Sequence, residues 1–308
     1  MLRSALFLLP FTLLAQGPVT VAFPCAEKDL QNAGLLCTED EPCSIYLEIN
    51  SIAPAGKKLF LAGDLHATSA TVSSILLSSD DGGVTWKEPF ERIPGAALDQ
   101  IQLYDLEHGW AAGEIQYPLP RDPFFLVTSD GGLSWRRRDI TEDGGPGSIV
   151  RFWFDSAQHG ELIVDAGKSA PGGRYLDYES ETSGESWMLR SATSDQPKIR
   201  RAPASFDNAD YRVRAASGGK TYQVEKRDGE KWDAIASFVI EVASCKLKQA
   251  ELKEPPPVTE QDPDKPDEPK DYVEELKLGS PSQTVSPKTP PRKPATSKPT
   301  TQPKEPLD

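Results

Sequence analysis

The sequence has few of the residues from which metal and catalytic centres are usually built. It contains three histidines and four cysteines among 308 residues, and no two cysteines have the Cys-x-x-Cys spacing of zinc sites and thiol oxidoreductases. Positive charge is also scarce, because 34 lysines and arginines stand against 47 aspartates and glutamates. The net charge of -13 argues against nucleic acid as a partner, since phosphate binding needs a basic surface. We therefore expect no metal ion, no cofactor and no catalytic triad.

Long apolar segments are equally scarce. The strongest apolar run, residues 6–14, follows Arg3 and precedes small residues at Ala15 and Ala22. A membrane span needs about 20 apolar residues, so this run predicts a secretory signal peptide instead. We expect residues 1–22 to be that peptide, with cleavage after Ala15 or Ala22. The mature chain is then secreted, periplasmic or held in the cell envelope, and it does not span a membrane.

The even number of cysteines fits an exported chain, because an oxidising compartment favours disulfides. Three cysteines lie within a short N-terminal segment, residues 23–43, and one lies far downstream. If all four pair, at least one bridge joins the two ends of the chain's body. Three pairings are open, and we favour Cys25 with Cys37 and Cys43 with Cys245.

One eight-residue pattern, [S/T]-x-D-x-G-x-[S/T]-W, occurs twice. The first copy, S-D-D-G-G-V-T-W, ends at Trp86, and the second, T-S-D-G-G-L-S-W, ends at Trp135. A weaker copy, S-E-T-S-G-E-S-W, ends at Trp187, and a shortened one, R-D-G-E-K-W, ends at Trp232, so the tryptophans are 49, 52 and 45 residues apart. Such a period predicts stacked units, each of which leaves an apolar face uncovered until a neighbour packs on it.

Short alternating stretches separate the copies of this pattern. Residues 45–49, 101–104, 149–154 and 211–215 each open a unit and mix apolar with polar residues at the period of a strand. Each unit is predicted to hold about four short strands. The expected fold is all-β, a β-propeller of about four blades over residues 44–247, in which residues 237–242 form a closing strand that pairs with the first unit. A homodimer that completes an eight-bladed ring and an extra blade without a recognisable repeat are alternatives.

The repeated pattern is expected to lock a turn with its own side chains. Asp81 and Asp130 can accept hydrogen bonds from backbone N–H groups, and glycines at the fifth position can adopt positive φ without a Cβ clash. The hydroxyl residue then starts the next strand, and the tryptophan buries its ring between sheets. Thr182 replaces the aspartate in the third copy, which predicts a looser turn. The residues expected to be structural are Ser79, Asp81, Gly83, Thr85, Trp86, Thr128, Asp130, Gly132, Ser134, Trp135, Ser180, Gly184, Ser186 and Trp187.

The composition changes sharply near the C-terminus. Of the 28 prolines, 14 lie between Pro255 and Pro306. Proline cannot donate a backbone hydrogen bond, and few apolar residues remain to offset the entropy of ordering. Residues 248–308 are therefore predicted to be a disordered tail rich in proline, lysine and glutamate.

The two complete copies look like the Asp-box, or bacterial neuraminidase repeat, of sialidases, sortilin-type receptors and photosystem II assembly-factor-like proteins. In the second unit, D-L-E-H-G-W-A-A-G-E followed by V-T-S-D-G-G-L-S-W is similar to a blade of the assembly-factor-like family. The resemblance implies a β-propeller whose boxes lie at the turn between the third and outermost strands. It also implies that the boxes are structural and lie away from the central face that binds ligands.

The same resemblance raises the possibility of an enzyme. A sialidase needs clustered arginines, a tyrosine nucleophile paired with a glutamate, and a general acid, and none of these can be assigned. Residues 90–94, F-E-R-I-P, match the sialidase Phe/Tyr-Arg-Ile-Pro motif only with Glu91 interrupting it. We therefore expect no catalytic residues.

Acidic residues recur at the end of the predicted second strand of three units. Asp64, Glu114 and Asp165 occupy these equivalent places, so they are expected to converge on one rim, where they bind a cation or a basic peptide. The function we infer is an exported, non-catalytic binding or assembly module with a protein or glycan partner. A sialidase-like glycan-directed hydrolase and a structural protein of the cell envelope are the alternatives.

Overall fold

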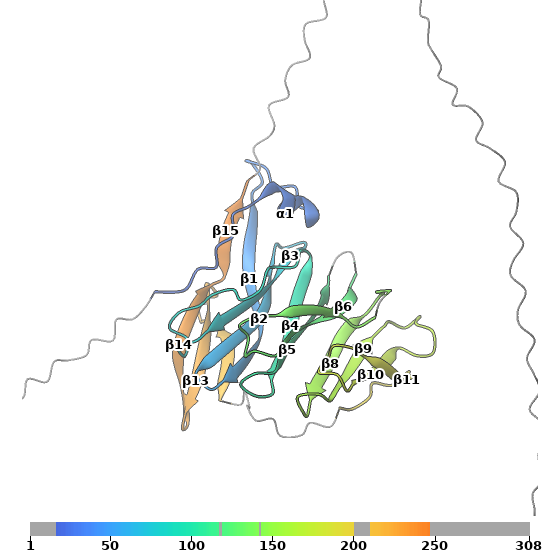
Figure 1. Cartoon of the computed structure of the whole chain (residues 1–308). Coiled ribbons are helices and arrows are strands. Elements are labelled where there is room, and N and C mark those ends of the chain that lie inside the picture. The colour runs from blue at the N-terminus through green and yellow to red at the C-terminus, as the bar shows by residue number, and fades with distance from the viewer. Residues whose placement is uncertain (1–16, 117–118, 142, 200–209, 247–308) are drawn as a thin grey trace, which may run out of the picture. The chain divides into compact units, whose positions relative to one another are not determined.

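The computed structural model describes residues 17–116, 119–141, 143–199 and 210–246 (Figure 1). The predicted tail and most of the predicted signal peptide lie outside these residues. The described part contains one helix, α1 (Glu27–Asn32), and fifteen strands. Among the described residues, no helix has the length and apolar character needed to cross a bilayer.

The strands form four antiparallel sheets. Sheet 1 contains β1 (Cys43–Ala55), β2 (Lys58–His66), β3 (Thr71–Ser79) and β15 (Glu241–Cys245). Sheet 2 contains β4 (Ala96–Leu103), β5 (Gly109–Ile115), β6 (Arg121–Thr128) and β7 (Arg136–Asp139). Sheet 3 contains β8 (Ser148–Phe154), β9 (Gly160–Asp165), β10 (Tyr175–Ser180) and β11 (Met188–Thr193), and sheet 4 contains β12 (Tyr211–Ala215), β13 (Thr221–Asp228) and β14 (Lys231–Val239). The prediction of an all-β propeller of about four blades is confirmed.

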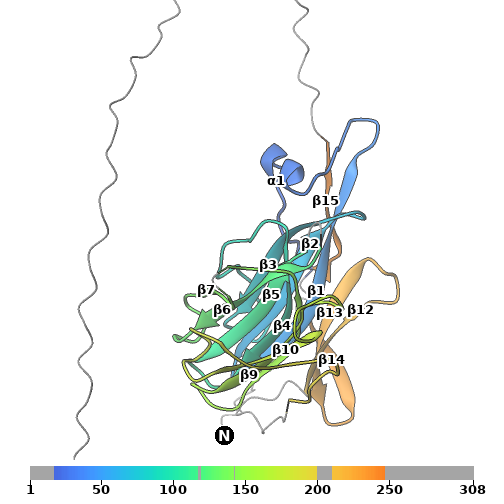
Figure 2. The ribbon, with the colours of Figure 1, turned by 90° about the vertical axis from the view of Figure 1, so that its right-hand side faces the viewer.

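The four sheets stack in the order 4, 1, 2, 3. Figures 1 and 2 show sheet 4 beside β1, and Figure 1 places sheet 3 at the other end of the row. Three clusters of buried side chains fill the interfaces between sheets 4 and 1, 1 and 2, and 2 and 3. Within the described residues no such cluster joins sheet 3 to sheet 4. The blades therefore form an open arc.

A side chain from the second strand of one sheet packs on the repeat turn of the next sheet. The ring of Phe60 on β2 meets Trp135 edge-on, with the centroids 5.8 Å apart. Trp110 on β5 is fully buried and donates from Nε1 to the carbonyl of Ser183 in the third repeat turn, at 2.7 Å. It also stacks on Phe154 of sheet 3, with the ring centroids 3.5 Å apart. Each blade thus completes the core of its neighbour.

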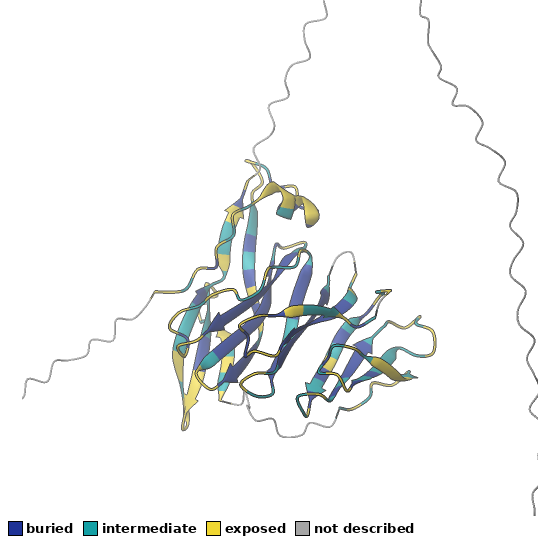
Figure 3. Cartoon of the chain, viewed as in Figure 1, coloured by how far each residue is buried: buried dark blue, intermediate teal, exposed yellow. Residues whose placement is uncertain are grey.

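The two ends of the arc carry polar faces. The position of Phe60 and Trp110 is taken on β9 by Glu161, which forms an ion pair with Arg190 at 3.6 Å. On sheet 4, Glu225 lies beside Val224, whose side chain joins the cluster toward sheet 1, so Glu225 points to the outer face. Figure 3 shows the same contrast, with buried residues between the sheets and exposed residues on β14 and β11. The end sheets therefore act as caps.

The first and second repeat turns are held by the hydrogen bonds that their pattern predicts. Asp81 Oδ1 accepts from the N–H of Val84 and Thr85 at 3.0 and 2.9 Å, and the backbone N–H of Gly83 donates to Ser79 Oγ at 2.8 Å. In the second turn the N–H of Ser134 donates to Asp130 at 3.0 Å and that of Gly132 to Thr128 at 2.9 Å. Both glycines have positive φ, 101° and 78°.

The third repeat turn keeps this pattern despite the loss of its aspartate. The hydroxyl oxygen of Thr182 accepts from the N–H of Ser186 at 3.0 Å, and Ser180 Oγ accepts from the N–H of Gly184 at 2.9 Å. The looser turn expected from the sequence is not observed, because a hydroxyl at this position still reaches the same N–H group. What the third turn lacks is the negative charge.

The fourth copy of the pattern was assigned to the wrong part of its unit. Asp228 pairs with Lys231, so the sequence around Trp232 forms the tight turn between β13 and β14. Gly229 there has φ 61°, as a two-residue hairpin turn requires. In sheets 2 and 3 the repeat turn follows the third strand instead. Sheet 4 has three strands, and the chain leaves it for sheet 1.

The two ends of the described chain meet where sheets 4 and 1 adjoin. A closing strand does pair with β1 and places Cys245 opposite Cys43, but it is β15 and not residues 237–242, because residues 237–239 belong to β14 of sheet 4. Val19 pairs with β14, with its N–H donating to the carbonyl of Ser237 at 2.7 Å, and Val21 is buried. Part of the segment assigned to the signal peptide thus belongs to the core.

All four cysteines are paired, but the favoured pairing was wrong. The disulfides join Cys25 to Cys245 and Cys37 to Cys43, with Cα atoms 5.3 and 5.2 Å apart. The short bend after Cys37 turns the chain back onto Cys43, whereas α1 separates Cys25 from Cys37. Cys25 is then free to reach Cys245, the partner of Cys43 in the strand register.

The two disulfides are expected to contribute unequally to stability. One closes a separation of 220 residues and the other a separation of 6. The chain-entropy model assigns about 5 kcal/mol to the long loop and about 2 kcal/mol to the short one. Replacing Cys25 and Cys245 with serine should therefore lower the free energy of unfolding in urea by about 3 kcal/mol more than replacing Cys37 and Cys43. Each disulfide has one buried cysteine, so both double variants bury one serine and this cost is the same in the two. Equal losses of unfolding free energy in the two variants would contradict the assignment.

Candidate functional site

The acidic positions singled out in the sequence lie at the end of the sheets opposite the repeat turns. Asp64, Glu114 and Asp165 lie at or near the ends of β2, β5 and β9 in the same register, each opposite the residue two positions before the bulged residue of the neighbouring strand. Gly63 and Gly113 come directly before two of them. A Cβ atom on either glycine would lie within 1.9 or 2.0 Å of a backbone carbonyl oxygen of the facing strand. The Gly-Asp and Gly-Glu pairs therefore belong to the bulge geometry that positions the carboxylates.

Asp64 lies in an acidic cleft between sheets 1 and 2. The cleft has a volume of about 580 Å³, and its polar lining residues include Glu48, Asn50, His66 and Asp99. The amide of Asn50, the bulge residue of β1, spans the two sheets. Its Nδ2 donates to the carbonyl of Leu98 at 3.2 Å, to Asp99 at 3.3 Å and weakly to Asp64 at 3.4 Å.

The carboxylates of the cleft crowd one another. Burial raises the pKa of Asp64 to about 6, with His66 lowering it and the negative charges of Glu48 and Asp99 raising it further. The pKa of Asp99 is raised as well, first by burial and then by Glu48. Three carboxylates thus share a cleft with one histidine. The arrangement suits a positively charged ligand.

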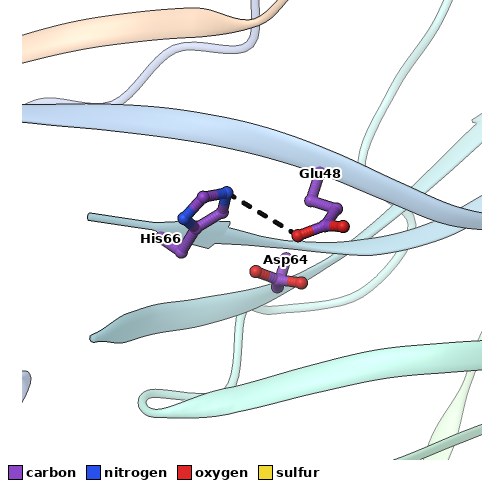
Figure 4. Close-up of side chains that lie close together, drawn as sticks. All are labelled: Glu48, Asp64 and His66. Atoms are coloured by element: carbon purple, nitrogen blue, oxygen red, sulfur yellow. Dashed lines mark ion pairs between the residues drawn. The ribbon is translucent and has the colours of Figure 1, made fainter. Parts of the chain in front are cut away.

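His66 stands at the mouth of the cleft with its two ring nitrogens in different surroundings. Its Nδ1 lies 3.1 Å from the carbonyl oxygen of Ala67, and its Nε2 lies 3.7 Å from a carboxylate oxygen of Glu48 (Figure 4). The carboxylate of Asp64 completes the group. Neither Glu48 nor His66 was selected from the sequence. Glu48 could have been identified from the sequence, because the alternation of the two strands places it opposite Asp64.

Glu114 is buried between sheets 2 and 3, and its carboxylate is shared with sheet 3. It accepts hydrogen bonds from the N–H of Ile149 at 3.4 Å and from the side chain of Gln116 at 3.3 Å. Burial, followed by the charge of Asp99, raises its pKa to about 7. Glu114 is thus electrostatically coupled to the acidic cleft through Asp99, although it does not line it.

Asp165 does not join the other two carboxylates. It binds Arg174 through two hydrogen bonds from Nε at 3.0 and 2.9 Å and one from Nη2 at 2.5 Å. This contact lowers the pKa of Asp165. The expected rim of three converging acids is therefore reduced to Asp64 and, at a distance, Glu114. Sheet 4 adds another buried carboxylate, Glu225, which accepts from Arg212 and Arg214 at 2.7 and 2.8 Å.

A second hollow opens at the same end of the arc, between sheets 2 and 3. This groove has a volume of about 760 Å³. Its lining is rich in apolar residues from both sheets and their connections, among them Pro120, Pro123, Ile140, Ala170, Leu176 and Tyr178. Leu119 stands at its edge and is 73% exposed. The hollow offers apolar contact area, and the ion-paired Asp165 and Arg174, together with Lys168, also line it.

The segment that resembles a sialidase motif has a local structural role. The guanidinium of Arg92 forms an ion pair with Glu88 at 2.6 Å and donates to the carbonyl of Ala22 at 2.9 Å. Arg92 therefore anchors the N-terminal segment to the region between sheets 1 and 2. The fit of this arginine to a substrate carboxylate is correspondingly poor.

Comparison with known proteins yields likenesses in backbone arrangement. No protein-family model matches the chain, and no curated protein matches it. Among solved structures, YCF48 bound to D1 peptide is similar, with 20% sequence identity over 64% of this chain and a TM-score of 0.35. YCF48 from Cyanidioschyzon merolae has 16% identity over 61% of this chain and a TM-score of 0.31. The chain covers 57% and 59% of those two structures.

The buried carboxyl of Glu114 is expected to make stability depend on pH. Its pKa rises from 4.5 to about 7 on folding, so the folded state binds the proton more tightly and its stability falls as pH rises from about 4.5 through 7. A shift of this size corresponds to a loss of about 3 kcal/mol by pH 8. Glu114→Gln should remove that loss, so urea unfolding at pH 5 and pH 8 should show the variant gaining on the wild type at the higher pH. The exposed Glu107→Gln is the control, and parallel pH profiles for wild type and Glu114→Gln would contradict the assignment.

Proposed function

We propose that this protein is an exported binding module that holds a polypeptide segment in the groove between sheets 2 and 3. The observation that carries the proposal is the groove itself, because a hollow of about 760 Å³ lined mainly by proline, aliphatic and tyrosine side chains fits apolar side chains of a partner. The larger apolar share of this lining favours the side chains of a polypeptide over the hydroxyl groups of a sugar. The partner is therefore a protein rather than a sugar.

The framework around the groove supports binding without large rearrangement. The floor of the groove includes Ile140, Val164 and Tyr178, which are buried in the cluster between sheets 2 and 3. Buried side chains thus preform the floor of the groove, and connections between strands supply most of its remaining lining. This arrangement favours a recognition role, in which the shape of the groove selects the partner.

Export is part of the same proposal. Two disulfides in a chain with a signal-like N-terminus are typical of an oxidising compartment. The pairing of Val19 with β14 and the burial of Val21 favour cleavage after Ala15, because cleavage after Ala22 would remove both residues from the core.

Peptide binding can be tested with a tryptophan that fills the groove. Ala170 lines the groove, and Ala170→Trp should weaken a peptide selected from a random display library by about tenfold or more, equivalent to about 1.4 kcal/mol. The matched control is Ala216→Trp, at the turn between β12 and β13 and away from the groove. Fluorescence anisotropy with the labelled peptide gives both affinities. Selection of no peptide, or equal affinities for the two variants, would count against the proposal.

The cleavage site can be read directly from the mature protein. Mass spectrometry of the N-terminal peptide of the exported chain should identify Gln16 as the first residue. A truncated chain that begins at Phe23 should unfold at a lower temperature, because it lacks the hydrogen bonds of Val19 and the buried side chain of Val21. A mature chain that begins at Phe23 and is as stable as the longer one would overturn this assignment.

A further inference from the structure

We propose that Glu48, Asp64 and His66 form a binding site for a divalent transition-metal ion such as Zn²⁺. The inference concerns the acidic cleft between sheets 1 and 2 and stands independently of peptide binding in the groove between sheets 2 and 3.

The three side chains present one donor atom each to a common point. Their donor atoms lie within 4.8 Å of one another. Asp64 and His66 are two residues apart on β2 and so point to the same face, and Glu48 lies directly opposite Asp64 on β1. Paired strands therefore hold all three donors (Figure 4). No loop has to close to assemble the site.

The orientation of His66 leaves one ring nitrogen available. Because Nδ1 lies 3.1 Å from the carbonyl oxygen of Ala67, that nitrogen carries the proton in the neutral ring. The lone pair of Nε2 then faces the carboxylates, with Glu48 3.7 Å away. The lone pairs of the imidazole nitrogen and of the carboxylate oxygens repel one another, and a cation between them would remove this repulsion. A histidine whose second nitrogen binds a backbone carbonyl is also the usual arrangement in metal sites.

Asp64 provides a second, independent indication. Its residue is 5% exposed, and its only hydrogen bond within the described part of the chain is the 3.4 Å contact from Asn50 to Oδ1. The other carboxylate oxygen lacks a donor there. A buried carboxylate that receives one long hydrogen bond is poorly compensated for its loss of water. A cation in the cleft would supply the missing partner.

The donor set indicates the class of metal. One imidazole nitrogen with two carboxylate oxygens suits zinc and neighbouring transition metals, whereas calcium takes six to eight oxygen ligands. Three protein ligands leave a position open toward the cleft for water or for a group of a partner. Both disulfides are intact and no described cysteine is free, so thiols do not compete for the metal.

The same fold contains a matched comparison. His159, Glu179 and Glu181 also bring three donors within 4.8 Å. Here, however, both nitrogens of the histidine are engaged, Nδ1 with Asp155 at 2.7 Å and Nε2 with Glu179 at 3.1 Å. These contacts raise the pKa of His159, as expected for a ring that donates from both nitrogens. This second cluster is an ion-pair network, and it serves as the control.

Isothermal titration of the chelator-treated mature chain with Zn²⁺ tests the proposal. We expect one zinc ion per chain, bound about tenfold or more weakly by His66→Gln and by Asp64→Asn. His159→Gln should leave the affinity unchanged. Because Asp64→Asn alters a buried group, its circular dichroism and unfolding temperature are measured beside it, and the less buried His66→Gln keeps the test valid if that variant does not fold.

A second titration distinguishes the metal class. Ca²⁺ should produce no heat at concentrations at which Zn²⁺ saturates, and bound Co²⁺ should show visible absorption that His66→Gln removes. Absence of zinc binding, or binding that persists in His66→Gln and disappears in His159→Gln, would overturn the assignment. Peptide affinity is measured with and without Zn²⁺, so that failure of zinc binding and failure of peptide binding in the groove can be told apart.

Discussion

The structure depends on the contact between one blade's second strand and the repeat turn of the next blade. A Cβ atom on Gly132 would lie 2.4 Å from the ring of Phe60, and a Cβ atom on Gly184 would lie 3.1 Å from the ring of Trp110. The two turns therefore need glycine for the rings to pack on them. Both glycines have a φ of 78°. This conformation is stabilised by the hydrogen bond that each glycine N–H donates to the hydroxyl group at the start of its turn. The turn thus has to form correctly before the neighbouring sheet can pack on it. The hydrogen bonds within the turn are therefore also a condition for packing between the sheets.

Much of the architecture could be predicted from the sequence because that requirement leaves a local signature. The hydroxyl, aspartate, glycine and tryptophan recur at fixed spacing, and their period marks the units. The fourth unit has no such constraint, since no sheet of the described part of the chain packs on the turn before Trp232, and its resemblance to the pattern was misleading. The disulfide pairing was equally inaccessible. Cys43 and Cys245 are indeed neighbours, but which neighbour each bonds depends on the path of the chain around α1.

The candidate site was only partly predictable for a related reason. Equivalent positions in successive units identified Asp64, Glu114 and Asp165, and all three do lie at or near the end of a second strand. Whether equivalent residues meet depends on what packs beside each sheet. Asp64 faces sheet 2 and finds Asp99 there, whereas Asp165 belongs to the last sheet of the arc and pairs with Arg174. The contribution of His66 depends on a single backbone carbonyl, which no pattern in the sequence records.

The open arc also determines which sheet unfolds locally first. An inner sheet is held on both faces, whereas sheets 3 and 4 each have one neighbour among the described residues. Sheet 4 is followed directly by β15 and the disulfide to Cys25, which tie it back to sheet 1. Sheet 3 has no covalent tie of this kind. In a linear array with nearest-neighbour coupling, such a unit opens locally at the lowest free energy, so β9 and β10 are the inner strands whose backbone groups reach solvent most readily.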